Sequence, residues 1–287
     1  MAKIISGKKI AKDLYLKFKN EIFYFRKRFN LTLKLAVLCI GGSAASRIYL
    51  NCKKKVCKDL GIDFEPYIAS STVSEQNVIN LLQKLNLRND ITGILLQLPL
   101  PSNFNKEKIL TSIDVNKDID SLNPLNLGKL VFPSYKEGKD FAPCTALAIL
   151  KILEYEQIDV VGKHVVIIGK SNIVGKPLAL ILSQRKATVT LCNSNTKNLN
   201  NICKSAEIIV SCTGVKHLIK KEMVTPGTVV IDAGILADNE GRVSGDVNFE
   251  EVAPMASVIT PVPGGVGPVT VAMIINNLII AAKKKYY

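Results

Sequence analysis

The sequence of 287 residues has no tryptophan, only two histidines and no CxxC pair among its seven cysteines. Because the cysteines are scattered and odd in number, we expect free thiols rather than a disulfide framework or a zinc site, and no metal. His164 begins an expected strand and His217 follows a turn, which argues against a histidine base. Proton-transfer chemistry must therefore use another kind of side chain.

The sequence also predicts neither a secretion signal nor a membrane span. The N-terminus, MAKIISGKKIAKD, has no uninterrupted apolar stretch and no cleavage site. The longest apolar tract, 271–282, is interrupted by Asn276 and Asn277 and is too short to span a bilayer. We therefore expect a cytoplasmic protein with no membrane partner.

The formal net charge of +14 is the one strong bias of the composition. The lysines are spread along the chain without an interleaved aromatic stripe, and they cluster only at 53–55 and 283–285. A nucleic-acid partner would account for such a charge, and so would a solvated basic surface that attracts small polyanionic substrates. We favour the small substrate and expect no nucleic acid.

Runs of β-branched residues alternate with amphipathic stretches over the whole chain, which predicts an α/β fold. The segment 121–142, with its prolines and glycines, is predicted to connect two domains, and 260–270 to form an irregular loop against a ligand. The expected helices are 8–29, 45–60, 74–87, 106–113, 145–155 and 271–282, and the expected strands are 33–40, 62–69, 92–97, 165–168, 188–191, 207–212, 228–233 and 257–260.

The stretch 164–196 predicts a strand, a loop, a helix and a second strand. Gly169 and Gly175 allow a tight turn, and Pro177 suits the first helical turn. The free N–H groups at such a helix start attract phosphate. The loop G-K-S-N-I-V-G lacks the usual three-glycine fingerprint, so a purely structural turn of helix onto sheet is the alternative.

Charge favours a nucleotide that carries an extra phosphate. The end of the second strand, 192–195, has no acidic residue to hold ribose hydroxyls, and Lys170 lies in the loop itself. We therefore predict NADP rather than NAD.

Tyr49 and Lys53 are four residues apart on one expected helix and so lie on one face. If Ile48, Cys52 and Val56 form the buried stripe, Lys53 lies at its edge, where desolvation lowers the pKa of a lysine toward proton transfer. The alternative is a surface lysine that snorkels beside a packed tyrosine. Short-chain dehydrogenases share the YxxxK spacing, but there the glycine-rich loop comes first, whereas here it follows.

Gln97 and Asp120 lie at the ends of an expected strand and an acidic loop, where they can aim hydrogen bonds at a bound heterocycle. Capping of the two turns is the alternative. Pro99 and Pro101 follow Gln97 and extend the chain beyond the carboxyl end of the strand, which is the edge where open α/β sheets bind ligands.

Seven motifs, in one order between residues 41 and 276, resemble the bifunctional methylenetetrahydrofolate dehydrogenase/methenyltetrahydrofolate cyclohydrolase family: AASRIYLNCK, GILLQLPLP, KDID, IGKSNIVGKP, VIDAGI, GDV and ITPVPGGVGP. The resemblance implies hydride transfer from methylenetetrahydrofolate to NADP, and hydrolysis of the methenyl product to 10-formyltetrahydrofolate by a homodimer. It implies two α/β domains with a cleft between them. These are a folate-binding catalytic domain at 1–140, closed by a C-terminal helix at 268–287, and a Rossmann-like NADP-binding domain at 141–267.

The resemblance also assigns roles to residues. Lys53 belongs to the hydrolytic step and is supported by Gln97. Tyr49 orients the folate, and Asp120 holds its pterin ring. The positions that match the catalytic and folate sites are Tyr49, Lys53, Gln97, Leu98, Asp120, Pro263 and Gly264. The positions that match the NADP site are Gly169, Lys170, Ser171, Ile173, Ser194, Thr213, Gly214, Gly234, Ile235 and Thr270.

Some positions depart from the residues usual in the family. Lys170 replaces an arginine, and the loss of the guanidinium fork weakens the case for tight 2′-phosphate recognition. The nearest rivals are a monofunctional NAD-dependent dehydrogenase and a folate-binding protein without turnover, and an intact Lys53 argues against both. The other departures are Ser121 for glycine, Ala146 and Ala148 for proline and glycine, Asn193 for a frequent histidine, Asn248 for aspartate and Val269 for methionine.

Overall fold

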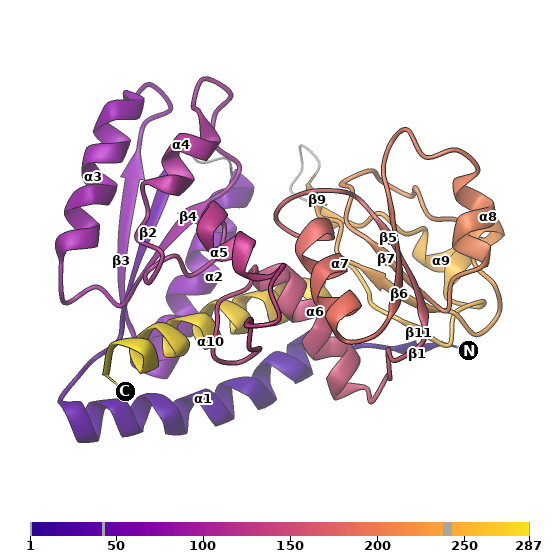
Figure 1. Cartoon of the computed structure of the whole chain (residues 1–287), viewed down its shortest axis with the longest axis horizontal. Coiled ribbons are helices and arrows are strands. Elements are labelled where there is room, and N and C mark those ends of the chain that lie inside the picture. Colours follow the sequence, from indigo (N-terminus) through magenta and orange to yellow (C-terminus); the bar gives the residue numbers. More distant parts are fainter. Residues whose placement is uncertain (1, 42–43, 238–242, 287) are drawn as a thin grey trace. The chain divides into compact units, whose positions relative to one another are not determined.

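The computed structural model describes residues 2–41, 44–237 and 243–286, without the side chains of 44–49 and Ala237. The α/β prediction is confirmed, and the chain forms two compact units (Figure 1). Unit 1 comprises Met1–Lys12 and Thr145–Met273, and unit 2 comprises Asp13–Cys144 and Ile274–Tyr287.

Unit 2 is built on a three-stranded parallel sheet in the order β3, β2, β4. The central strand β2 is apolar and almost wholly buried, as expected for a strand covered on both faces. Helix α3 begins at Ser74, whose hydroxyl accepts the N–H of Asn77 at 3.2 Å, and buries one apolar face. The elements are α1 (Gly7–Phe29), β2 (Lys34–Ile40), α2 (Ala44–Leu60), β3 (Asp63–Ala69), α3 (Glu75–Leu87), β4 (Gly93–Gln97), α4 (Lys106–Thr111), α5 (Pro124–Lys129) and the end of α10 (Val266–Tyr286).

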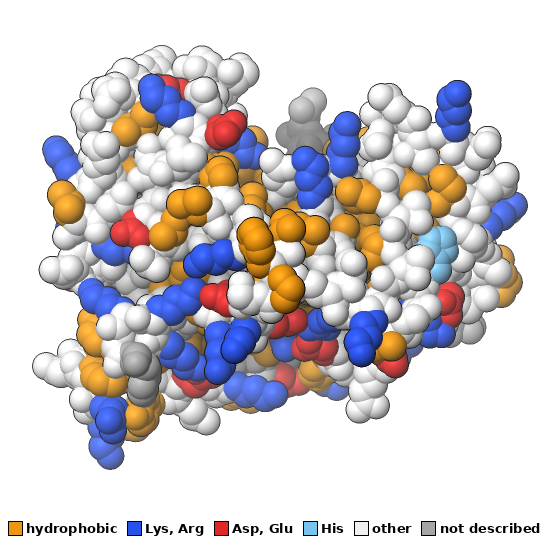
Figure 2. Space-filling model, in the orientation of Figure 1, with side chains coloured by type: hydrophobic (Ala, Val, Ile, Leu, Met, Phe, Trp, Pro, Cys, Tyr) orange, Lys and Arg blue, Asp and Glu red, His pale blue; other side chains and the backbone are white. Residues whose placement is uncertain are grey.

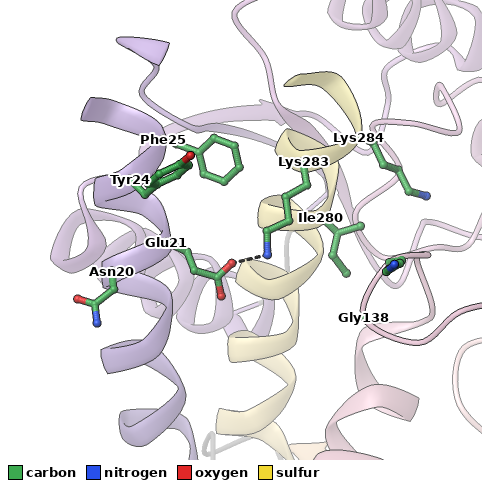
Figure 3. Close-up of a pocket in the computed structure, with 9 residues that line it drawn as sticks. Asn20, Glu21, Tyr24, Phe25, Gly138, Ile280, Lys283 and Lys284 are labelled. Carbon is green, nitrogen blue, oxygen red and sulfur yellow. Dashed lines mark hydrogen bonds and ion pairs between the residues drawn. The ribbon is translucent and has the colours of Figure 1, made fainter. Parts of the chain in front are cut away.

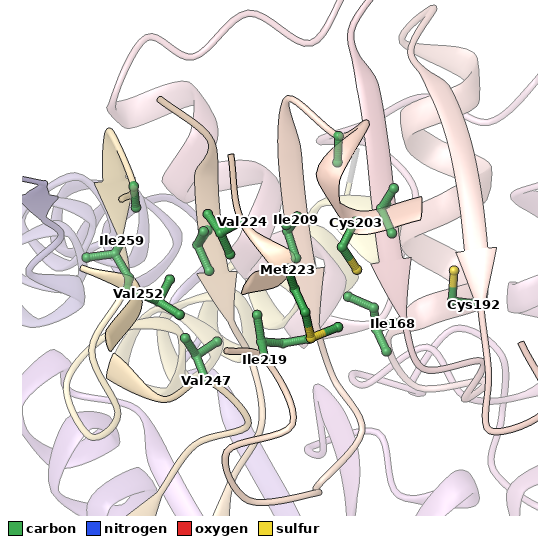
Figure 4. Close-up of a cluster of buried hydrophobic side chains, with 14 residues drawn as sticks. Ile168, Cys192, Cys203, Ile209, Ile219, Met223, Val224, Val247, Val252 and Ile259 are labelled. Carbon is green, nitrogen blue, oxygen red and sulfur yellow. The ribbon is translucent and has the colours of Figure 1, made fainter. Parts of the chain in front are cut away.

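Unit 1 carries a six-stranded parallel sheet in the order β1, β11, β8, β7, β5, β6. Its β-branched strands bury their side chains in an apolar cluster that includes Ile168, Ile209, Val230 and Ile259 (Figure 4). Such an all-parallel sheet with crossover helices has the Rossmann-like arrangement that was predicted. The elements are β1 (Lys3–Ile4), α6 (Cys144–Tyr155), β5 (His164–Ile168), α7 (Gly175–Gln184), β6 (Thr188–Cys192), α8 (Leu199–Lys204), β7 (Ile208–Ser211), η1 (Lys221–Met223), β8 (Val229–Asp232), β9 (Leu236–Ala237), β10 (Val243–Ser244), α9 (Phe249–Val252) and β11 (Val258–Ile259).

The N-terminus differs from the predicted domain division. Residues 1–12 were assigned to the folate-binding domain, but they belong to unit 1 because β1 pairs with β11, with Lys3 opposite Val258. A two-residue strand at a sheet edge has no periodicity of its own, so this pairing leaves no signal in the local sequence.

The segment 121–142, predicted to connect two domains, lies inside unit 2. It contains helix α5, which begins with Pro124 after Asn123, whose side chain accepts the N–H of Leu125 at 3.0 Å. Both residues are typical of a helix start. The helix is too short for its apolar spacing to be recognised.

Helix α10 is longer than the predicted 271–282 and includes the second half of the predicted loop 260–270. Pro268 lies in its first turn, where a missing N–H costs nothing. By length and composition α10 could cross a membrane, contrary to the prediction that this tract is too short, but 72% of its apolar window is buried inside the protein. Core helices of globular proteins have the same character.

Candidate functional site

Lys53 is a buried lysine on α2. Its exposed fraction is 8%, whereas the adjacent Lys54 is exposed. The buried face of α2 runs through Leu50, Lys53 and Cys57, so the predicted stripe through Cys52 was wrong: Cys52 is exposed. A surface lysine that snorkels into water is therefore contradicted. Burial lowers the pKa of Lys53, and the nearby Asp120 carboxylate opposes this shift.

Gln97 is the partner of the Lys53 amine. Lys53 Nζ donates to Gln97 Oε1 at 2.5 Å, and Gln97 Nε2 donates to the carbonyl oxygen of Leu98 at 2.8 Å. The second bond fixes which end of the amide faces the lysine. Gln97 is the last residue of β4, at the carboxyl edge of the sheet, and Leu98 precedes a cis proline.

Asp120 reaches the same edge because its segment runs beside β4. The N–H of Ile94 donates to the carbonyl of Lys117 at 2.7 Å, and the N–H of Ile119 donates to the carbonyl of Ile94 at 3.2 Å. Asp120 Oδ1 accepts the N–H of Cys144 at 3.3 Å. Burial raises the pKa of Asp120, and the Lys53 ammonium opposes the rise.

The two aspartates of the motif KDID have different surroundings. Asp118 accepts the N–H groups of Leu122 and Asn123 at 3.2 and 2.8 Å and the Asn126 amide at 3.0 Å, so it caps the turn into α5. Burial raises its pKa to about 6. Capping was the alternative for Asp120; in the structure Asp118 caps the turn into α5, and Asp120 accepts the N–H of Cys144 at the start of α6.

Asn277 on α10 is a buried residue that the sequence did not single out. Its amide nitrogen donates to the carbonyls of Ile119 and Ala142 at 2.8 and 2.9 Å, which ties the residue before Asp120 and the chain just before Cys144 to the helix. The sequence presented it only as a polar interruption of an apolar tract.

Ser121 adopts φ +54° and is fully buried, and among the described residues its hydroxyl has no hydrogen-bond partner. The family's usual glycine would suit this left-handed conformation better. The side chain of Tyr49, also predicted for the site, lies outside the described side chains.

In unit 1, the loop from Gly169 to Gly175 turns tightly between β5 and α7. A Cβ on Gly169 would lie 2.6 Å from the carbonyl oxygen of Cys212, and one on Gly175 would lie 1.7 Å from the carbonyl oxygen of Gly169. The side chains of Lys170 and Ser171 are exposed at this turn, and Ser171 Oγ accepts the N–H of Val174 at 3.2 Å. Helix α7 begins at Gly175, two residues before the predicted Pro177.

Two buried aspartates, Asp232 and Asp246, shape the neighbouring strand ends and were not predicted as site residues. Asp246 accepts the N–H of Thr213 at 2.6 Å and its hydroxyl at 2.9 Å. Asp232 accepts the N–H groups of Gly234 and Asp246 at 2.9 and 3.1 Å. Burial raises the pKa of Asp232 to about 6. Asp232 belongs to the motif VIDAGI and Asp246 to the motif GDV. These two motifs were the only feature of the sequence that could have pointed to the two aspartates.

The other predicted residues of the nucleotide and folate sites also lie in unit 1. Ser194 and Ile235 are exposed, Ile173 is half-buried, and Thr270 Oγ1 donates to the carbonyl of Val266 at 3.2 Å. Pro263 follows a cis peptide bond and Gly264 has φ +109°. The structure thus brings Lys53, Gln97 and Asp120 together in unit 2, to which Tyr49 and Leu98 also belong. The other predicted residues lie in unit 1, at its loops except for Thr270 on α10.

Comparison with known protein families identifies the family of this chain. The profile described as tetrahydrofolate dehydrogenase/cyclohydrolase, catalytic domain, matches residues 5–120, and the NAD(P)-binding domain of the same family matches residues 143–286. The chain belongs to the tetrahydrofolate dehydrogenase/cyclohydrolase family. Within it, Lys53, Gln97 and Asp120 lie in the part that matches the catalytic domain, and the loop after β5 lies in the part that matches the NAD(P)-binding domain.

Relatives in the family match over nearly the whole chain. Bifunctional protein FolD of Acetivibrio thermocellus is 41% identical over 282 residues, which cover 98% of this chain and 97% of the relative. The FolD crystal structure from Campylobacter jejuni has a TM-score of 0.93 and 37% identity, with 99% of this chain and 100% of that chain covered. FolD of Trypanosoma brucei, solved with NADP cofactor and an inhibitor, has a TM-score of 0.94 and 31% identity, with 100% and 99% covered.

Proposed function

We propose that this member of the family catalyses two consecutive steps of folate one-carbon metabolism. The first is the NADP-dependent oxidation of methylenetetrahydrofolate to methenyltetrahydrofolate, and the second is hydrolysis of that product to 10-formyltetrahydrofolate. The observation that carries the proposal is the buried Lys53 amine, held 2.5 Å from Gln97 at the carboxyl edge of the sheet in a chain of this family.

For the oxidation, NADP supplies a hydride acceptor. One hydride leaves the methylene carbon of the substrate, and the broken C–H bond leaves a methenyl cation. We assign cofactor binding to the loop after β5, because Gly169 and Gly175 have no room for a side chain and the backbone can approach a phosphate. Lys170 and Ser171, both exposed there, suit the 2′-phosphate. Ile173, Ser194, Thr213, Gly214, Gly234, Ile235 and Thr270 complete the proposed cofactor site.

For the hydrolysis, a water oxygen bonds to the methenyl carbon while the water gives up a proton. We assign this proton to the neutral Lys53 amine, since burial lowers its pKa and enlarges the neutral fraction. Gln97 Oε1 accepts an N–H of the amine and so orients it. The hydroxyl of the resulting adduct then loses its proton and its oxygen forms the carbonyl double bond as the bond from the carbon to the pterin nitrogen breaks; that nitrogen takes this proton, and the formyl group stays on the other nitrogen.

The remaining roles concern folate binding. Asp120 is assigned to the pterin ring, because a carboxylate can accept the ring N–H groups. Tyr49 is assigned to orient the folate, and Leu98, Pro263 and Gly264 to line its site. The division into a folate-binding domain and an NADP-binding domain, with a cleft between them, is part of the same proposal.

We also propose a cytoplasmic homodimer that binds tetrahydrofolate substrates and no nucleic acid. On the face in Figure 2, Lys and Arg side chains are dispersed rather than gathered in one stripe, which suits a solvated basic surface. Strand β6, at one end of the six-stranded sheet, has Leu191 37% exposed and is a candidate contact between copies. Light scattering of the purified protein tests the dimer.

An absorbance assay with methylenetetrahydrofolate and either nicotinamide cofactor tests the proposed reactions. With NADP, methenyltetrahydrofolate should appear and then decay to 10-formyltetrahydrofolate by enzyme-dependent hydrolysis. Accumulation of the methenyl product with NAD alone would favour the monofunctional dehydrogenase. Folate binding without any turnover would favour a binding protein.

A further inference from the structure

Unit 2 contains a cavity of about 680 Å³ between α1, α10 and the loop at Gly138 (Figure 3). None of the residues that line it is Lys53, Gln97 or Asp120, so it is separate from the proposed catalytic group. Its volume lies within the roughly 300–1,000 Å³ typical of small-molecule sites. We call it the α1/α10 cavity.

The inner part of the α1/α10 cavity is apolar and aromatic. Phe25 on α1 and Ile280 on α10 are 1% and 3% exposed and form its floor. Tyr24 is 44% exposed, and its ring meets Phe25 edge to face, with centroids 6.3 Å apart. An aromatic ligand could therefore pack on Tyr24 in an offset or edge-on arrangement, as aromatic pairs prefer.

The rim of the cavity carries an excess of positive charge. Lys139, Lys283 and Lys284 line it together with Glu21, and Asp140 pairs with Lys284, so three positive charges less two negative leave a charge of +1. Lys283 Nζ lies 2.5 Å from the Glu21 carboxylate, which holds the ammonium between the two helices. An apolar floor beneath a cationic rim is complementary to a molecule with a flat apolar body and an anionic group.

Lys284, next to Lys283 on α10, is held by its surroundings. Lys284 Nζ lies 3.3 Å from Asp140 Oδ1 and 4.4 Å from the centroid of the Phe141 ring, and its side chain is 28% exposed. The Asp140 carboxylate already shares this charge, so Lys284 would meet an incoming carboxylate as part of the Lys284–Asp140 pair, with little loss of side-chain freedom.

We propose that the α1/α10 cavity binds a small aromatic carboxylate. Its ring lies against Tyr24 and Phe25, and its carboxylate lies among Lys139, Lys283 and Lys284. The site is distinct from the substrate and cofactor sites of the proposed reactions, so its occupation does not require turnover.

Isothermal titration calorimetry of the full chain tests the proposal, with 2-naphthoate as the probe and uncharged 2-naphthamide as its matched control. Saturating tetrahydrofolate and NADP are present so that a folate or nucleotide site cannot account for the heat. We expect 2-naphthoate to bind at one site, at least about ten-fold more tightly than 2-naphthamide, as a charge-assisted contact predicts.

Variants then locate the site. K139Q/K283Q should weaken 2-naphthoate at least ten-fold, whereas K8Q/K27Q, which removes two exposed lysines of α1 outside the cavity, should not. Y24A should weaken the binding of both probes. F23A, at a neighbouring residue that is 64% exposed, should weaken the binding of neither. The proposal is overturned if 2-naphthoate does not bind, if 2-naphthamide binds equally well, or if K139Q/K283Q binds like its control.

Discussion

Replacement of Lys53 by methionine should separate the two activities. The variant loses the amine that takes the proton of the attacking water, and loss of a general base typically lowers a rate by about 100-fold or more. Dehydrogenase turnover should persist in part, because hydride transfer needs no base, so methenyltetrahydrofolate should accumulate. Methionine keeps the apolar stem in a position that is only 8% exposed, so its packing is retained.

The structural cost of Lys53→Met follows from the close polar contact that Lys53 makes with Gln97. Gln97 Oε1 would lose the donor that now lies 2.5 Å away, which costs about 1–3 kcal/mol if water does not replace it. This is less than the typical 5–15 kcal/mol of a whole domain, so the variant should fold. Lys54→Met is the matched control, since Lys54 is the exposed neighbour on the same helix and its loss should leave both rates unchanged.

The assay is hydrolysis of methenyltetrahydrofolate followed by absorbance, with NADP reduction measured separately. In the wild type, hydrolysis should increase with pH and level off, with an apparent pKa below the ordinary value of about 10.4, because burial lowers the pKa of Lys53 and the neutral amine is the active form. Hydrolysis by Lys53→Met at the wild-type rate would refute the assignment of the proton to this residue.

Three further outcomes are expected. Lys170→Ala should reduce the preference for NADP over NAD by about ten-fold, as loss of a charge-assisted contact predicts, with the NAD rate unchanged in steady-state kinetics. Ser121→Gly should raise the free energy of unfolding by about 1–2 kcal/mol in urea titration, because it relieves φ +54° and removes a buried hydroxyl that has no partner among the described residues. Arg88→Met should destabilise the protein at pH 7 and less so below about pH 4, because Arg88 lowers the pKa of Asp90 and Glu65 in the folded state. A carboxylate with a lowered pKa stabilises the fold at pH values above its pKa in the unfolded chain, and this stabilisation is lost as the pH falls.

Each of these expectations has its own control. Lys197→Ala, at another exposed lysine of unit 1, should leave cofactor preference unchanged, and an equal effect there would point to general charge instead. Ser121→Ala removes the hydroxyl but keeps the strained backbone, so it should raise the free energy of unfolding by less than Ser121→Gly does. A lower free energy of unfolding in both variants would contradict the strain argument. The effect of Arg88→Met should shrink in high salt, and an effect independent of salt and pH would show that packing, not charge, is responsible.

Local patterns predicted most of the regular elements because their periodicity is strong. The strand before Gly169 and the helix after Ser74 were both expected close to their observed bounds, since a β-branched run and an apolar stripe behind a cap each occupy a single stretch of sequence. The two-residue β1 and the short α5 were missed, because a two-residue strand or a helix of fewer than two turns has no period to detect.

For this protein the sequence alone determined the α/β class, the family and the kinds of side chain available for chemistry, because those properties are written in runs of neighbouring residues. Tertiary structure decided which of the candidates meet. Lys53 and Gln97 are 44 positions apart and touch only because the fold brings the middle of α2 to the carboxyl end of β4, where Gln97 is the last residue. The same packing buries Lys53 and exposes Cys52, the reverse of the predicted stripe, since the rotation of a helix about its axis is set by the surface it covers.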